Sequence, residues 1–405
     1  MSFFGFGKKI SYLGIDIGTT SIKLVELTKE NGVPTLLTYG YAERPLDDVV
    51  HNDPDKVKQE SINLLAKIYK RSGAISYKAT TALPNFSVFT SVISLPIMPK
   101  KELAEAIRWE AKKFIPIPLE DVVLDWEIIE EKVEGGKNIS KETEGGDGQK
   151  EIKTEESQIK NKTFTGTITE KASIPSEKEE KLSETRNGTA FIRPTKKIYR
   201  ILLTAASKNL VQRYIDIFKA ADLQLLSLET EAFALSRALI GKDETVSMVI
   251  DTSAVTTDII IIENGLPILN RSIDVGGVTL TRALANALKI DFRRAEQFKR
   301  DIGLSDESKI PAIIEQAFKP VVDEINYSLN LYQSQTGRLI EKIILSGGSA
   351  YLNNLSNYLS NILKVKVLIG DPWARIAYPA ELRPALEEIA PRFAVAVGLA
   401  LRQLE

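Results

Sequence analysis

The chain has 405 residues, enough for two to four structural units, and its 43% hydrophobic and 26% charged residues are the balance of a soluble globular protein. A formal net charge of -1 gives no electrostatic attraction for nucleic acid, so we expect no nucleic-acid partner. The absence of cysteine and the single histidine, His51 in an expected exposed turn, exclude disulfides, thiol chemistry and the common zinc sites.

No segment reaches the roughly 20 consecutive apolar residues of a membrane-spanning helix, and no signal peptide is visible, which predicts a cytoplasmic protein. The opening MSFFGFGKK is compatible with a disordered terminus and with contact at a membrane surface, and is too short to anchor the chain alone.

The first hundred residues alternate apolar strands with an amphipathic helix. Residues 12–27 form two apolar runs around a Gly-Thr turn, which predicts a β-hairpin. Apolar residues at three- and four-residue spacings predict a helix over 55–71. Strands are expected over 78–84 and 87–96.

A second helix is expected over 100–114, with Leu103, Ile107 and Trp109 available for packing. The prolines of the following IPIP segment end it, because proline cannot continue the hydrogen-bonded ladder. The run VVLDWEII at 122–129 begins another strand.

Composition changes at about residue 133, and residues 133–195 are polar, charged and nearly free of apolar clusters. Such a segment cannot bury enough apolar surface to offset the entropy of ordering, so we predict a disordered insertion between neighbouring strands. The strand at 198–207 and a helix at 209–221 follow it. A solvated loop and a regulatory linker are both compatible with this segment.

The second half repeats the opening pattern. After a strand at 223–229 and a helix at 231–240, residues 246–265 again form two apolar runs around a polar turn. In both units an aspartate ends the first strand, which indicates two related lobes that face each other across a cleft.

The first of these turns has the residue types of a phosphate site. Asp16 ends the strand, the turn of Gly18, Thr19 and Thr20 offers backbone N–H groups and hydroxyls, and Lys23 adds positive charge. Consecutive backbone N–H groups bind anions, and carboxylates hold Mg²⁺ through retained waters. Taken alone this is a weak signal, because a Gly-Thr turn of this kind is more often just a hairpin.

The second turn carries Asp251, Ser253, Thr256 and Thr257, followed by Asp258. Two such turns in opposition would hold a polyphosphate from both sides.

Two glycine pairs follow in order. Gly276 and Gly277 allow a close turn that enters a helix, whose N-terminus favours anions. Gly347, Gly348 and Ser349 follow an apolar strand and also enter a helix; lacking a Cβ, these glycines would let a base or ribose approach the backbone.

In this order the segments resemble the phosphate-1, connecting, phosphate-2 and adenosine motifs of the actin, heat-shock-70 and FtsA superfamily. GIDIGTTSIKLVEL, ETEAFALSRAL, IDVGGVTLTRAL, AEQFKR, ILSGGSA and IGDPW look most like segments of its PilM family, and the resemblance covers the chain outside residues 133–195. It implies an α/β fold, the two-lobed actin-like ATPase (RNase H-like) fold with a small FtsA-type subdomain. ATP and Mg²⁺ are the implied cofactors.

The resemblance also implies roles for single residues. Asp16 and Asp251 would coordinate Mg²⁺ indirectly, Glu231 would lie near the attacking water, and Glu296 and Lys299 would line the nucleoside pocket. Glu231 is equally explained as a helix N-terminal acid, and Glu296 with Lys299 as a solvated pair three residues apart.

One position departs from the pattern. The family tends to have glycine where this chain has Ser253, which puts close contact with the γ-phosphate in doubt and predicts at most slow ATPase activity.

The domains implied are the first lobe, a partner-binding subdomain, a connecting part, the second lobe and a C-terminal helix returning to the first lobe, at residues 1–79, 80–222, 223–245, 246–376 and 377–405. The last segment, PRFAVAVGLALRQLE, has the pattern of a buried helix, so we expect no counterpart of the C-terminal amphipathic membrane helix of FtsA.

By resemblance to the PilM family, the chain would be an ATP-binding adaptor at the cytoplasmic face of the inner membrane. It would bind the N-terminal cytoplasmic peptide of a PilN-like membrane protein and other pilus components, with indirect membrane contact. An FtsA-like division or filament protein, a small-molecule kinase and a nucleotide-free scaffold are the alternatives.

Overall fold

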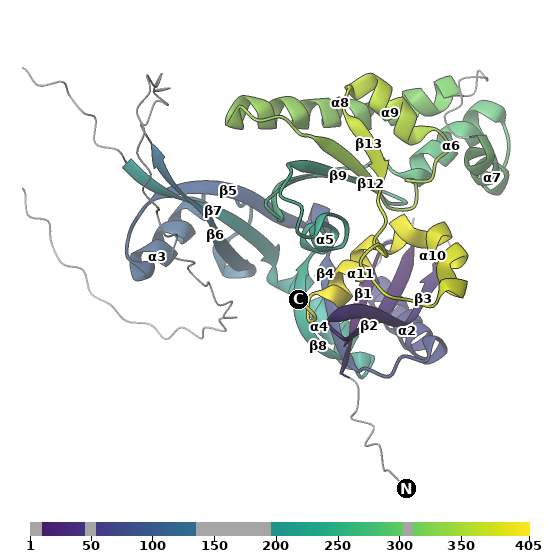
Figure 1. The fold of residues 1–405 in the computed structure, drawn as a ribbon, viewed down its shortest axis with the longest axis horizontal. Coiled ribbons are helices and arrows are strands. Elements are labelled where there is room, and N and C mark those ends of the chain that lie inside the picture. Colours follow the sequence, from purple (N-terminus) through teal and green to yellow (C-terminus); the bar gives the residue numbers. More distant parts are fainter. Residues whose placement is uncertain (1–9, 45–53, 135–195, 303–310) are drawn as a thin grey trace, which may run out of the picture. The chain divides into compact units, whose positions relative to one another are not determined.

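The structure, a computed structural model, describes residues 10–44, 54–134, 196–302 and 311–405 (Figure 1). The expectations for His51, for the N-terminal segment and for nearly all of the 133–195 insertion lie outside these residues. Within the described ranges, no helix has both the length and the apolar character needed to cross a membrane.

The first sheet contains the predicted hairpin. Its strands lie in the order β3-β2-β1-β4-β8, with β1 and β2 antiparallel and with β4 and β8 parallel to β1. Two helices cover one face, where Leu13 and Ile15 pack with Phe218. The elements are β1 (Ser11–Ile17), β2 (Ser21–Glu30), β3 (Val33–Glu43), β4 (Lys78–Leu83), β8 (Gln224–Thr230), α2 (Pro54–Ser72) and α4 (Lys208–Ala220).

The second sheet repeats the first. Its order is β11-β10-β9-β12-β13, again three antiparallel strands followed by two parallel ones. This confirms the duplication that the two similar turns predict. The elements are β9 (Ser247–Thr252), β10 (Thr257–Glu263), β11 (Leu266–Ile273), β12 (Lys342–Ser346), β13 (Lys366–Ile369), α6 (Gly277–Leu288), α7 (Phe292–Ile302), α8 (Pro311–Thr336) and α9 (Leu355–Leu363).

Two short helices pack in the apolar core that joins the sheets. These are α5 (Glu231–Leu235), which continues as the π-helical turn η3 (Ser236–Ile240), and α11 (Ala394–Leu401). Gly398 makes their contact possible, because a Cβ there would lie 1.9 Å from the carbonyl oxygen of Ala234. The segment before α11 contains η4 (Ala380–Leu382), α10 (Arg383–Ile389) and η5 (Ala390–Phe393).

A three-stranded sheet, in the order β5-β7-β6, forms the small subdomain with α3. The elements are η1 (Asn85–Ser87), β5 (Val88–Pro96), α3 (Lys100–Ala111), η2 (Leu119–Asp121), β6 (Val122–Glu134) and β7 (Lys196–Ser207). The expected limits of 80 and 222 also include most of β4 and all of α4, which pack in the first lobe. β6 also extends to Glu134, so the strand continues past the expected start of the insertion.

Two details of α3 differ from the sequence prediction. The helix ends at Ala111, three residues before the predicted end, and Trp109 is 71% exposed, so the expectation that it packs in the core is wrong. Leu103, Ile107 and Ala111 follow one another at four-residue spacing and therefore share the buried face, whereas Trp109 is two residues from Ile107 and lies on the opposite side.

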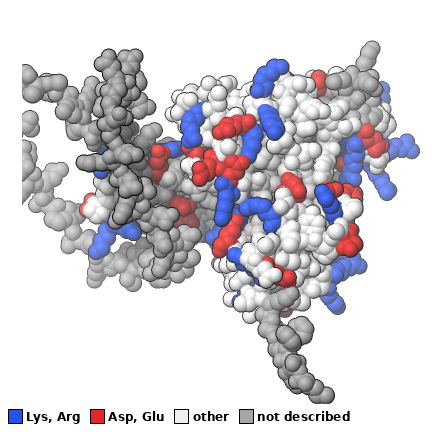
Figure 2. Space-filling model, viewed as in Figure 1, with Lys and Arg blue, Asp and Glu red and all other residues white. Residues whose placement is uncertain are grey.

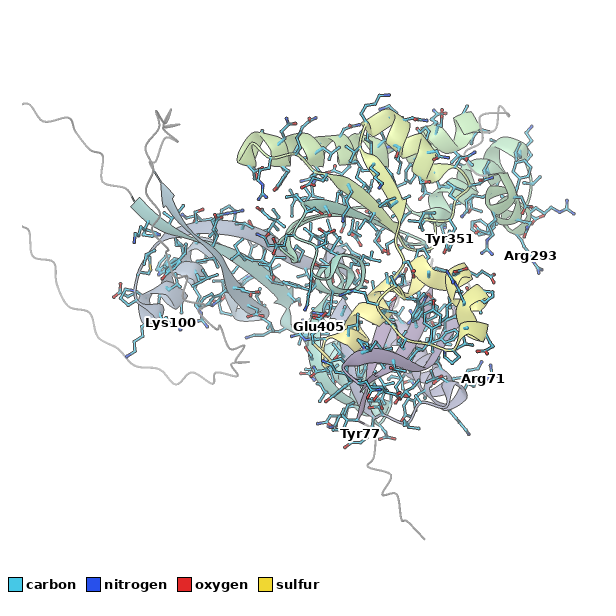
Figure 3. The ribbon with its side chains drawn as sticks, viewed as in Figure 1. Arg71, Tyr77, Lys100, Arg293, Tyr351 and Glu405 are labelled. Carbon is cyan, nitrogen blue, oxygen red and sulfur yellow. The ribbon has the colours of Figure 1, made fainter. Side chains whose placement is uncertain are left out.

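A further difference lies after β12. Gly347, Gly348 and Ser349 do not lead directly into a helix, since a series of turns separates them from the start of α9 at Leu355. Tyr351, in these turns, donates a hydrogen bond from its hydroxyl to the carbonyl oxygen of Glu387 in α10 (Figure 3). The visible surface mixes acidic and basic side chains, in keeping with the small net charge (Figure 2).

Candidate functional site

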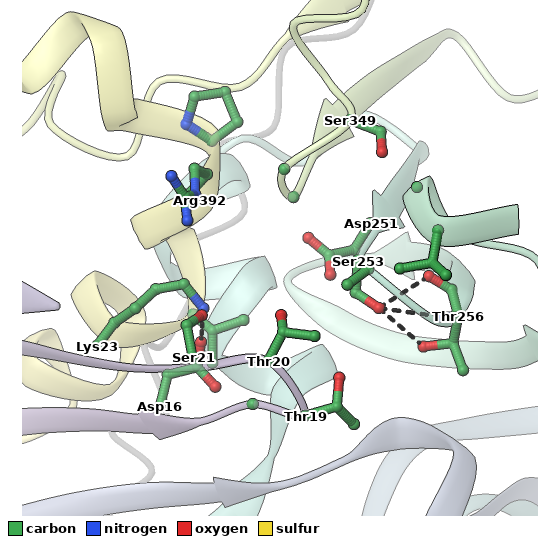
Figure 4. Close-up of a pocket in the computed structure, with 18 of the residues that line it drawn as sticks. Asp16, Thr19, Thr20, Ser21, Lys23, Asp251, Ser253, Thr256, Ser349 and Arg392 are labelled. Carbon is green, nitrogen blue, oxygen red and sulfur yellow. Dashed lines mark hydrogen bonds and ion pairs between the residues drawn. The ribbon is translucent and has the colours of Figure 1, made fainter. Parts of the chain in front are cut away.

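A cavity of about 940 Å³ brings together the two predicted phosphate turns (Figure 4). Every predicted site residue except Gly276 lines it. Those residues are Asp16, Gly18, Thr19, Thr20, Lys23, Glu231, Asp251, Ser253, Thr256, Gly277, Glu296, Lys299, Gly347, Gly348 and Ser349.

The first turn joins β1 to β2 and is tightly held. Gly18 N–H donates to the Ser21 carbonyl at 3.0 Å, and the Thr20 carbonyl accepts from Arg44 N–H at 2.8 Å. Asp16 is buried at the end of β1, and its Oδ2 accepts a hydrogen bond of 2.7 Å from Lys23 Nζ. Lys23 therefore pairs with Asp16 and also lines the cavity, so its positive charge is available to a ligand there.

The second turn is closed by the side chain of Ser253. Its Oγ accepts from the N–H groups of Val255 at 3.3 Å and Thr256 at 3.1 Å, and its own N–H donates to the Thr256 carbonyl at 2.9 Å. This is a Ser turn, in which a hydroxyl replaces part of the backbone hydrogen bonding. The serine at the position where glycine is typical thus stabilises a compact loop.

Glycines allow the turns around the cavity to approach one another. Gly347 has φ of +83°, and a Cβ on it would lie 2.4 Å from the Thr252 carbonyl oxygen. A Cβ on Gly276 would lie 2.7 Å from the carbonyl oxygen of Ala254. Nothing lies within 4 Å of the Cβ direction of Gly348, so this backbone is the one that remains open to a ligand.

Lys299 and Glu296 do not form a solvated pair, because Lys299 is only 7% exposed. Its Nζ donates to Gly277 O at 3.0 Å, to Thr281 Oγ1 at 2.9 Å and to Glu296 Oε2 at 2.8 Å. Burial lowers the pKa of Lys299, and Glu296 opposes this effect. Burial acts to raise the pKa of Glu296, but hydrogen bonds and the charge of Lys299 hold it below its usual value.

Four of the carboxylates that line the cavity, those of Asp16, Glu231, Asp251 and Asp258, interact with one another. Burial raises the pKa of Asp251 to about 6; the Asp16 carboxylate acts in the same direction, against Ser346 and Lys23. Burial and the negative charges of Asp258 and Asp16 raise the pKa of Glu231 well above its usual value.

Asp258 lines the cavity but was not among the predicted site residues. It accepts a hydrogen bond from the Ser272 hydroxyl, and burial raises its pKa to about 7. The signal in the sequence was the hairpin itself, because antiparallel pairing of β9 and β10 places Asp258 directly opposite Asp251.

Three cationic side chains, Arg44, Arg300 and Arg392, also line the cavity without having been predicted as site residues. Arg300 ends the AEQFKR segment, whereas Arg44 and Arg392 belong to no recognisable motif. Arg44 follows β3, and Arg392 lies just before α11, far from the first turn in sequence.

Two sheets of equal strand order, two helices in the core between them and a cavity between their first turns define the two-lobed actin-like ATPase fold. A solved structure, the "PilM-PilN type IV pilus biogenesis complex", matches with a TM-score of 0.71 and 24% identity over 98% of this chain and 99% of that chain. The "MamK double helical filament" matches with a TM-score of 0.50 and 11% identity over 98% of this chain and 99% of that chain.

The family described as type IV pilus assembly protein PilM matches residues 14–140 and 185–404. The chain belongs to this family. It is therefore a type IV pilus assembly protein, as the order of its motifs indicated.

Proposed function

We propose that this protein is an ATP-binding adaptor of the type IV pilus inner-membrane complex, which binds the N-terminal cytoplasmic tail of a PilN-like protein. The observation that carries the nucleotide part is the cavity in which the two turns of the duplicated hairpins meet. The partner is proposed because the solved complex that this chain resembles pairs PilM with PilN.

The residues of the cavity fit ATP and Mg²⁺ in their chemistry. In the first turn the Gly18 N–H is taken by the Ser21 carbonyl, so Thr19 and Thr20 are the residues that offer N–H groups and hydroxyls for phosphates, while Lys23 and Arg392 supply positive charge. The open backbone at Gly348 leaves space for a base or ribose. Asp16 and Asp251 would hold Mg²⁺ through its waters, and the ion would neutralise phosphate charge.

The chain's own groups suit a slow hydrolysis. A carboxyl whose pKa lies near 7 is suited to accept a proton at neutral pH, and Asp258 meets this condition. Glu231 lies in the same group of acids, in the position expected near an attacking water. The Ser253 hydroxyl donates to the Thr256 carbonyl at 3.0 Å and accepts from two N–H groups of its own loop, so it is not free to bind phosphate.

A thermal-shift experiment tests the nucleotide part. ATP with Mg²⁺ is expected to raise the melting temperature, since a ligand selective for the folded state stabilises it by mass action. Asp16→Asn should remove most of the shift, whereas the control Asp323→Asn, on the exposed face of α8, should retain it. An equal shift in Asp16→Asn would contradict the assigned site, and no shift in the wild type would favour a nucleotide-free scaffold.

The small subdomain supports the partner part, because several of its large apolar side chains are exposed. Among them are Ile97, Trp109, Phe114, Ile117, Val123 and Ile128. Exposed apolar side chains are a feature of binding surfaces, and an apolar peptide segment is the partner they suit. The protein would then be held at the cytoplasmic face of the inner membrane by this partner.

A labelled N-terminal peptide of the PilN-like protein, titrated against the full chain, tests this contact. Replacing Trp109 and Phe114 with serine should weaken binding at least tenfold, whereas Tyr327→Ser, at an exposed aromatic on α8, should not. Equal binding by both variants would remove the subdomain as the docking surface. No binding by the wild type at saturating ATP would defeat the adaptor function.

A further inference from the structure

Asn85 lies in the turn η1, between β4 of the first sheet and β5 of the small subdomain, and it is only 2% exposed. Its backbone N–H donates to Glu231 Oε2 at 3.0 Å. Its side-chain Oδ1 accepts from the N–H of Ala232 at 3.1 Å. Asn85 is thus joined to two residues that lie 146 and 147 positions further along the chain, by one hydrogen bond that it donates and one that it accepts.

These bonds replace the usual cap of α5. The N-cap residue Thr230 makes no side-chain hydrogen bond to the first turn of the helix. The first N–H groups of a helix have no partner within it, and an Asn oxygen is among the best acceptors for them. Here that oxygen comes from η1, so the start of α5 and the turn that leads into the subdomain are held as one unit.

The same turn is in contact with the cavity and with the second lobe. Pro84 and Phe86, on either side of Asn85, line the cavity together with Glu231. The strand β11 packs against η1 and β5. Asn85 Nδ2 makes no hydrogen bond of normal geometry, although it lies near enough to Asp258 to oppose the rise in the pKa of that carboxyl.

We propose that Asn85 is a positioning residue, which fixes the Glu231 carboxylate toward the cavity and transmits the state of the nucleotide site to the small subdomain. This inference rests on the proposed function, because it requires nucleotide in the cavity. A ligand that changes the charge next to Glu231 changes the position of its carboxylate. The hydrogen bond from Asn85 N–H then moves η1, and β5 follows η1 directly in the chain.

Hydrogen exchange of the full chain, with and without ATP and Mg²⁺, tests the proposal. In the wild type, nucleotide should slow exchange of the backbone amides in residues 85–95 at least threefold. Asn85→Ala and Glu231→Gln should each lose at least half of this response, and the double variant should lose no more than either single variant. Ser87→Ala is the matched control in the same turn: its hydroxyl donates to Pro84 O at 2.7 Å and bonds neither Glu231 nor Ala232.

Asn85→Asp separates positioning from mere capping. Aspartate caps a helix as well as asparagine does, so a purely structural role predicts a response like that of the wild type. A positioning role predicts a lost response, since a second negative charge beside Glu231 displaces its carboxylate. Displacement of a fluorescent nucleotide measures whether each variant still binds.

The outcomes separate the two proposals. No nucleotide binding by the wild type would overturn the proposed function and this inference with it. Normal nucleotide binding with an unchanged response in Asn85→Ala or Asn85→Asp, or additive losses in the double variant, would overturn this inference alone.

Discussion

The acid cluster makes a prediction about stability that needs no ligand. Asp258 is 3% exposed, and its pKa rises from 3.8 to about 7 on folding, so the folded state retains a proton that the unfolded state releases. Because the folded pKa is the higher one, this contribution to stability is complete below pH 3.8 and disappears as pH rises through 7.

The magnitude follows from the shift. Each pKa unit corresponds to about 1.4 kcal/mol, so Asp258 contributes about 2 to 3 kcal/mol at pH 5 and nearly nothing at pH 8. The nucleotide-free protein should therefore lose stability between pH 5 and 8. Asp251, with its pKa raised to about 6, acts in the same direction. Asp258→Asn removes the proton uptake at one site and should therefore reduce the loss of stability between pH 5 and 8 by about 2 kcal/mol.

Urea unfolding, followed by the fluorescence of buried Trp373, measures this between pH 5 and 8. Asp243→Asn is the matched control, because the hydrogen bond from Lys342 lowers the pKa of Asp243 to about 2. The contribution of Asp243 is present above pH 3.8 and is lost only as pH falls toward 2, so its variant should parallel the wild type in the measured range. Parallel curves for Asp258→Asn and the wild type would refute the reasoning.

Three further predictions concern the fold. Gly398→Ala should cost about 1–3 kcal/mol, since its Cβ would meet the backbone of α5, whereas Gly348→Ala, beside open space, should leave unfolding of the nucleotide-free protein unchanged. Trp373→Ala should cost about 3–5 kcal/mol and exposed Trp109→Ala less than about 0.5 kcal/mol, measured as the free energy of unfolding. Replacing residues 135–190 with a short Gly/Ser linker should preserve melting and ATP binding, because β6 and β7 are neighbours in one sheet; an insoluble product would contradict this.

Most buried strands of the two sheets were predictable from the sequence because they are largely apolar runs, whereas β3, β11 and β13, whose residues are mostly half-buried or exposed, were not predicted. The run at β10, for example, buries Ile259, Ile260, Ile261 and Ile262. Because the turn between two such runs has to be polar, the duplicated hairpins and the site at their turns could be recognised in the sequence. The face of α3 was predicted less well, since Trp109 is apolar and only its helical position relative to Ile107 shows that it points outward.

Contacts that join distant segments had no local signal. Asn85 follows a proline in a short turn, as many surface residues do, and nothing nearby indicates that its partner is Glu231. Similarly, α4 follows the subdomain in sequence but packs in the first lobe, since its apolar face fits the core around Leu13 and Ile15. Local sequence patterns determine which faces of helices and strands are buried. Only the tertiary arrangement determines which other elements those faces pack against.

The requirements of a stable fold do not explain why the cavity contains these acidic residues. Asp251, Asp258 and Glu231 each have a pKa raised by burial, and the charge of Asp251 further raises the pKa of the other two, so their charged forms oppose the folded state at neutral pH. An apolar or amide side chain at these positions would avoid that cost. Local conflicts of this kind are expected at functional sites, where a ligand removes them. A cation beside the carboxylates would lower all three pKa values together, whereas an anion alone would raise them, so in the proposed site we expect nucleotide to bind more tightly with Mg²⁺ than without it.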